Sequence, residues 1–108
     1  MAEPIQVITT TATQEDAQAI ASALVEQRLA ACVQIIGPIT STYRWQAGVE
    51  TSQEWMCLIK SRLDLYQGLE RAIREMHPYE APEILAVPVV RGHQAYLHWL
   101  CEATSPGG

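Results

Sequence analysis

The segment from His77 to Ile84, HPYEAPEI, gathers the side chains in this sequence that are best suited to chemistry. It places an imidazole, a phenol and carboxylates close together, and its two prolines restrict the backbone. Imidazole nitrogens and carboxylates bind Cu²⁺ and Zn²⁺, although such sites usually assemble three or four donors. The alternative is a stiff corner in which His77 ends a helix and hydrogen-bonds its terminal carbonyls. These residues alone leave both interpretations open.

No motif with a defined enzymatic mechanism occurs. The sequence lacks a G-x-G-x-x-G, a P-loop, a G-x-S-x-G and an H-E-x-x-H motif. Its only aspartates, Asp16 and Asp64, stand where helices are expected to begin, which disfavours a Ser-His-Asp triad. We therefore predict a protein that is not an enzyme. The enzyme alternative is a general acid/base pair formed by His77 and Glu80.

Composition and charge argue against several classes of partner. The 108 residues carry 7 Lys and Arg and a formal net charge of -5, so no basic face for nucleic acid or an anionic membrane is expected. The longest apolar run, LAACVQIIG, is shorter than the roughly 18 residues that a membrane span needs. The start, MAEPIQ, lacks the features of a signal peptide, and the 3 cysteines form no C-x-x-C pair. We expect a cytoplasmic protein that suits cationic partners, divalent metals included.

Apolar periodicity predicts two longer helices and a short terminal one. After the β-branched run IQVITT, which predicts a strand, Thr13 and Asp16 match a capping-box helix start. One apolar stripe follows: Ala17, Ile20, Ala21, Leu24 and Val25. A second stripe, ended by Pro78, consists of Leu65, Leu69, Ala72, Ile73 and Met76. The segment HQAYLHWLCEA is expected to close the chain as a helix, with His93 and His98 as solvated or cap-side imidazoles.

Residues 32–62 are predicted to form a β-hairpin with long arms, because Val, Ile, Thr, Tyr and Trp are frequent and QAG supplies the turn. At ~3.3 Å per residue, the first arm, residues 32–45, would span on the order of 45 Å. A compact domain of this length has a diameter of only roughly 34 Å. Gly37-Pro38 interrupts the arm, or its distal half leaves the protomer and pairs with another chain, or both. Burial of Tyr43 and Trp45, which share a face, favours a homo-oligomer.

The order of elements predicts the fold class α+β. Two β-α-β halves that share a hairpin make a ferredoxin-like split β-α-β sandwich, here with a long β-hairpin and a C-terminal helix. The segment EILAVPVV is the last strand, and Pro88 places it at an edge or in a bulge. A single domain is expected over residues 1–104, followed by a flexible C-terminal tail at 105–108.

Several segments resemble one known family. EQRLAACVQIIGPITSTYRW, IKSR, HPYEAPEILAVPV and YLHWL stand in the order and at the spacing of the CutA divalent-ion tolerance proteins, from about Ile5 to Leu100. The resemblance implies a PII-like homotrimer of ferredoxin-like protomers, in which the long hairpin strands pair between protomers. It also implies a role in tolerance of divalent cations, copper above all.

The resemblance also supplies candidate metal ligands. It implies copper binding through His77, and we take Glu50 and Glu80 as possible acidic donors. The family uses in addition a cysteine near the end of the first strand, a region in which this chain offers only Thr9, Thr10 and Thr11. A thiolate is a far better soft ligand than a hydroxyl, so we expect a weak Cu²⁺ site and no tightly bound cofactor.

A trimeric sensor is the alternative function. The PII signalling proteins, which the implied architecture resembles, bind small effectors in clefts between subunits. Residues at matching family positions are expected around such a cleft: Tyr43, Trp45, Lys60 and Tyr79. The family's W-x-G-K turn is WQAG in this chain, so an anion-binding role for that lysine is not expected.

Overall fold

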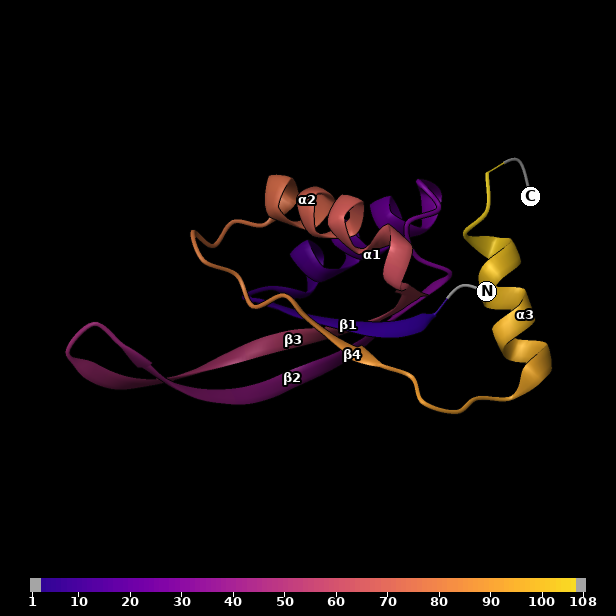
Figure 1. Ribbon diagram of the computed structural model, residues 1–108. Coiled ribbons are helices and arrows are strands. Elements are labelled where there is room, and N and C mark those ends of the chain that lie inside the picture. The colour runs from indigo at the N-terminus through magenta and orange to yellow at the C-terminus, as the bar shows by residue number, and fades with distance from the viewer. Residues whose placement is uncertain (1–2, 107–108) are drawn as a thin grey trace.

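A four-stranded antiparallel sheet with two helices on one face forms the body of the protein (Figure 1). The computed structural model describes residues 3–106. In chain order the elements are β1 (Pro4–Thr11), α1 (Gln14–Glu26), β2 (Cys32–Trp45), β3 (Gly48–Arg62), a 3-10 turn (Leu63–Leu65), α2 (Tyr66–Met76), β4 (Leu85–Pro88) and α3 (Gln94–Ala103).

The strand order is β2-β3-β1-β4. The two units are β1-α1-β2 and β3-α2-β4. In the sheet, β3 lies between β1 and β2, and β1 lies between β3 and β4, which is the split β-α-β arrangement. The predicted α+β, ferredoxin-like fold class is confirmed.

The helices begin and pack largely as the sequence predicts. The Thr13 hydroxyl accepts a hydrogen bond from the backbone N–H of Asp16 at 3.1 Å and so caps α1. Four members of the first predicted stripe are buried, but Val25 is 42% exposed. In the second stripe Met76 is 38% exposed. The period of both stripes is correct, and only the last member of each stripe, in the final turn of its helix, faces water.

The hydrophobic core lies between the two helices and the inner face of the sheet. Its members come from both layers: Ile5, Val7, Ala17, Ile20, Leu24, Ala30, Cys57, Ile59, Leu69 and Ile73. Burial raises the pKa of the Cys57 thiol to about 11. The other two cysteines, Cys32 and Cys101, are free like Cys57 but only partly buried. Among the three cysteines only Cys57 is fully buried, as a small apolar side chain of the core.

β2 and β3 form the predicted long hairpin, and its distal half projects beyond the rest of the sheet (Figure 1). A cis peptide bond at Gly37-Pro38 accompanies a register shift, after which the two strands stay paired as far as the turn. β1 pairs with β3 only from Trp55 onward, so residues 48–54 lie beyond its end. The molecule is elongated, with principal extents of 46, 26 and 22 Å. The Gly37-Pro38 step thus disturbs the ladder without ending the arm, and the distal half does leave the body of the protomer.

β4 is an edge strand, as Pro88 predicts. It pairs with β1, from Leu85 opposite Ile8 to Pro88 opposite Ile5, and is shorter than the predicted strand EILAVPVV. Figure 1 shows the preceding segment, residues 77–84, descending from the helix layer to the sheet.

α3 follows at the end of the sheet opposite the hairpin turn (Figure 1). Of the predicted tail at 105–108, residues 107–108 lie outside the described residues. No described helix combines the length and the apolar character needed to cross a membrane.

Candidate functional site

His77 is held by three hydrogen bonds at the end of α2. Its backbone N–H donates to the Ile73 carbonyl at 2.8 Å. Its ring Nε2 donates to the Thr10 carbonyl at 2.7 Å, and its ring Nδ1 accepts from the Tyr79 backbone N–H at 3.1 Å. Because a carbonyl accepts and an N–H donates, these contacts fix a neutral imidazole with its proton on Nε2. The ring is buried and bonds to a strand carbonyl, not to the helix carbonyls that a simple stiff corner predicts.

Tyr79 and Glu54 extend this contact into a polar cluster. The ring centroids of Tyr79 and His77 are 4.7 Å apart, and the Tyr79 hydroxyl donates to Glu54 Oε2 at 2.7 Å. Glu54 is only 8% exposed, so the phenol satisfies a buried carboxylate. Burial of the phenol, followed by its bond to Glu54 and the charge of Glu54, raises the pKa of Tyr79. We call Thr10, His77, Tyr79 and Glu54 the corner cluster.

The corner cluster forms where β1 stops and β3 continues. The last residue of β1 pairs with Trp55, so Glu54 is the first β3 residue beyond the end of β1. The segment after α2 passes this end, and Pro78 restricts the backbone between the imidazole and the phenol. The sequence analysis missed Glu54, because its position depends on the register between two distant strands. No local pattern distinguishes it from Glu50.

Of the other predicted metal ligands, Glu50 lies far from His77 within one protomer. Glu80 is exposed on the segment after α2, and Glu50 is exposed in the distal hairpin. His77 bonds to Thr10, which pairs with Met56 of β3. Along β3, Glu50 lies about 20 Å from Met56 at ~3.3 Å per residue. Among the described residues, no three His, Cys, Asp or Glu side chains gather closely enough to hold a metal ion. A site that joins Glu50 to His77 requires a second protomer, so the assignment stays a prediction.

The residues predicted around an effector cleft are also spread over the protomer. Tyr43 and Trp45 lie near the hairpin turn and are 39% and 54% exposed. Lys60 lies in the body of the sheet, where its Nζ donates to Gln34 Oε1 at 2.9 Å. Tyr79 alone belongs to the corner cluster. A common cleft therefore stays a prediction that depends on contact between protomers.

Three threonines end β1 in the region where the resembled family has its cysteine. Thr11 Oγ1 donates to the Thr13 carbonyl at 2.7 Å, and the Thr10 carbonyl accepts from His77. Thr9 is fully buried, and its hydroxyl has no hydrogen-bond partner in the described part of the chain. These side chains supply hydroxyls in place of a thiolate, so this region offers no soft ligand for Cu⁺.

The fold and the corner cluster together define a class: ferredoxin-like α+β domains with a projecting hairpin and an H-P-Y corner whose histidine is buried. Within this class the chain belongs to the CutA1 divalent ion tolerance protein family, which matches residues 5–103. The resemblance carried by the sequence segments is confirmed.

Individual relatives agree with this assignment. The Divalent-cation tolerance protein CutA of Thermus thermophilus is 45% identical over 98 residues, which cover 91% of this chain and 95% of the relative. The mouse Protein CutA is 44% identical over 88 residues, which cover 82% of this chain and 50% of the relative. The chain thus spans nearly the whole bacterial relative and about half of the mouse one.

Solved structures of the same family share the fold. The divalent cation tolerance protein Cut A1 of Thermus thermophilus superposes with a TM-score of 0.92 at 43% identity, over 94% of this chain and 99% of that one. CutA of Xylella fastidiosa gives a TM-score of 0.93 at 35% identity, over 95% and 99% of the two chains.

Proposed function

We propose that this protein contributes to tolerance of divalent cations by binding the ion, without chemical turnover, as a cytoplasmic homotrimer. The observation that supports the proposal most is the family match, which extends from residue 5 to residue 103 and so through nearly the whole described fold. The names of relatives refer to divalent-cation tolerance, and the alternative of an effector sensor is not favoured.

Two features of the protomer support association. The distal hairpin continues beyond the end of β1 and carries exposed apolar side chains: Tyr43, Trp45 and Val49. The sheet face opposite the helices exposes others: Ile36, Leu85 and Val87. A projecting hairpin with such a surface is a template for pairing with another chain. We propose that the hairpins pair between protomers, with the number of three taken from the family resemblance.

The proposed copper ligand is Nδ1 of His77. Metal-bound histidines usually donate their other ring N–H to a carboxylate or a backbone carbonyl, which fixes the ring and its tautomer. His77 already donates Nε2–H to Thr10, so Nδ1 is available once it releases the Tyr79 backbone N–H. We propose that Glu80 and a neighbouring protomer's Glu50 add oxygen ligands. The ion is Cu²⁺, weakly bound, because this set contains no thiolate.

Native mass spectrometry during a Cu²⁺ titration tests the assembly and the ligand together. We expect a trimer that binds copper, and we expect His77→Gln to lose one copper per protomer while the trimer persists. His93→Gln is the matched control, because His93 is exposed and lies outside the corner cluster. A monomer, or a His77→Gln trimer that loads as much copper as the wild type, would contradict the proposal.

The cytoplasm is proposed as the compartment because all three cysteines are free, which suits a reducing environment. Fractionation of cells that express the untagged protein tests this. Recovery in a membrane or periplasmic fraction would argue against it.

A further inference from the structure

α3 carries an imidazole and a carboxylate, two side chains of the types that bind divalent metals, outside the corner cluster. His98 and Glu102 are four residues apart on one helix face, and His98 Nε2 lies 3.5 Å from Glu102 Oε2. Their side chains are 76% and 69% exposed. We propose that this pair binds a borderline divalent cation such as Zn²⁺, with water in the remaining coordination positions. The site uses no residue of the corner cluster, so it does not depend on copper binding by His77.

The distance between the two donor atoms suits one cation geometry in particular. A tetrahedral Zn²⁺ with nitrogen and oxygen ligands at ~2.1 Å holds those two atoms about 3.4 Å apart. Two adjacent ligands of a square-planar Cu²⁺ lie only about 3.0 Å apart. The observed 3.5 Å between the two donor atoms therefore matches the tetrahedral spacing.

The existing contact between His98 and Glu102 is weak, so a cation can replace it at little cost. At 3.5 Å it is longer than a good hydrogen bond, and an ion pair so exposed contributes little to stability. A cation that takes both donors replaces this contact with two shorter bonds.

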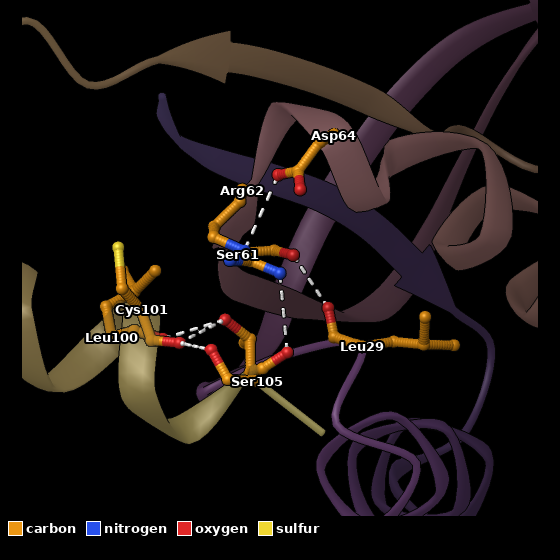
Figure 2. Close-up of polar contacts among 8 residues, drawn as sticks. Leu29, Ser61, Arg62, Asp64, Leu100, Cys101 and Ser105 are labelled. Carbon is orange, nitrogen blue, oxygen red and sulfur yellow. Dashed lines mark hydrogen bonds and ion pairs between the residues drawn. The ribbon is translucent and has the colours of Figure 1, made fainter. Parts of the chain in front are cut away.

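Hydrogen bonds of its neighbours order the end of the helix that carries Glu102 (Figure 2). Thr104 Oγ1 donates to the Leu100 carbonyl at 2.9 Å, and Ser105 Oγ donates to the Cys101 carbonyl at 2.7 Å. Arg62 Nη2 donates to the Thr104 carbonyl at 3.4 Å and ties the end of α3 to β3. A metal-binding side chain on an ordered backbone loses less conformational entropy when it binds an ion, which raises the affinity of the site for that ion.

The two-ligand set makes the proposed ion exchangeable. No group of three potential ligands exists among residues 3–106, so His98 and Glu102 supply two bonds and water supplies the others. Structural zinc sites close with four protein ligands, whereas open positions allow the ion to leave or be passed on. The pair on α3 is therefore an exposed loading site for divalent cations.

Isothermal titration calorimetry of the whole protein with Zn²⁺ tests the site. We expect His98→Gln to weaken this binding step at least tenfold and Glu102→Gln to weaken it several fold. His93→Gln is the matched control, since the residue four positions after His93 is Leu97 and no chelate can form there. An unchanged isotherm in His98→Gln would overturn the inference, and so would an equal loss in His93→Gln.

The variant His77→Gln separates this inference from the proposed function. If the α3 site exists, His77→Gln keeps the Zn²⁺ step that His98→Gln loses. Loss of copper by His77→Gln tests only the corner cluster, so either proposal can fail alone. Nuclear magnetic resonance gives an independent readout, because Zn²⁺ should shift the His98 ring signals and leave those of His93 in place. Shifts of equal size at both histidines would overturn the inference.

Discussion

The imidazole Nε2 of His77 donates a hydrogen bond of 2.7 Å to the carbonyl oxygen of Thr10. This contact joins residues 67 positions apart and ties the end of α2 to the end of β1. It also fixes the tautomer that leaves Nδ1 as the acceptor nitrogen. One hydrogen bond thus serves both the packing of the corner and the orientation of the proposed ligand.

His77→Ala is expected to lower the free energy of unfolding by about 1–3 kcal/mol, because it leaves the Thr10 carbonyl without its partner in a buried corner. Urea unfolding at a fixed protein concentration measures the change, since the stability of an oligomer depends on concentration. His93→Ala, at an exposed position, serves as control and should stay within about 0.5 kcal/mol of the wild type. Equal losses in the two variants would show that the corner bond contributes nothing.

Tyr79 is expected to make the folded state less stable at alkaline pH. Burial first, and then the hydrogen bond to Glu54, raises the pKa of Tyr79 above its ordinary value of 10.0. Below pH 10 the phenol is protonated in the folded and unfolded chains, and its contribution to stability is fully present. Above pH 10 the unfolded chain releases the proton first, so the free energy of unfolding falls as the pH rises.

Urea unfolding at several pH values between 10 and about 12 measures this fall. Tyr79→Phe should make it shallower without abolishing it, because burial also raises the pKa of Tyr66 and Tyr96. Glu54→Gln removes the charge that opposes the phenolate and should reduce the slope as well. The interpretation fails if wild type and Tyr79→Phe lose stability in parallel.

Thr9 and Thr11 form a matched pair with opposite expected effects. Thr9→Val should raise the free energy of unfolding by about 1 kcal/mol, because it removes a buried hydroxyl that has no hydrogen-bond partner among the described residues. Thr11→Val should lower it by about 1 kcal/mol, because it removes the bond of 2.7 Å to the Thr13 carbonyl. Thermal or urea unfolding of both variants measures the difference. Changes of the same sign would refute this account of the strand end.

The fold could be predicted from the sequence because the local sequence signals agree with the packing of the elements. Thr13 caps α1 as the capping pattern predicts, and Pro88 marks an edge strand. Val25 and Met76 belong to the predicted apolar stripes but face water, because periodicity records which helix face is apolar and not which of its members another element covers. That coverage is a tertiary property, and no local pattern contains it.

The site was only partly accessible, for a similar reason. The H-P-Y motif identified His77 and Tyr79, and the structure brings their rings together. Glu54 was missed because it meets Tyr79 only through the register of β1 on β3. Glu50 and Trp45, which the family pattern favoured, lie in the projecting hairpin, and their role depends on a second protomer.

Gly37 is expected to tolerate no side chain, because Trp55 fills the space beside it. A Cβ at this position would lie 2.7 Å from Cγ and 2.8 Å from Nε1 of the Trp55 indole. Trp55 packs against the core, so Gly37→Ala must displace a large ring and should cost about 1–3 kcal/mol of unfolding free energy. Gly48→Ala, where a Cβ meets nothing within 4 Å, is the control and should be nearly neutral.

A double-mutant cycle with Trp55→Ala assigns the cost at Gly37 to this contact. Once the indole is gone, Gly37→Ala has no ring to displace, so its cost should fall by at least half. Urea unfolding of the four proteins at one concentration gives the coupling energy between the two positions. If Gly37→Ala costs the same with and without the indole, the steric contact with Trp55 is not the reason for a glycine at this point of the hairpin.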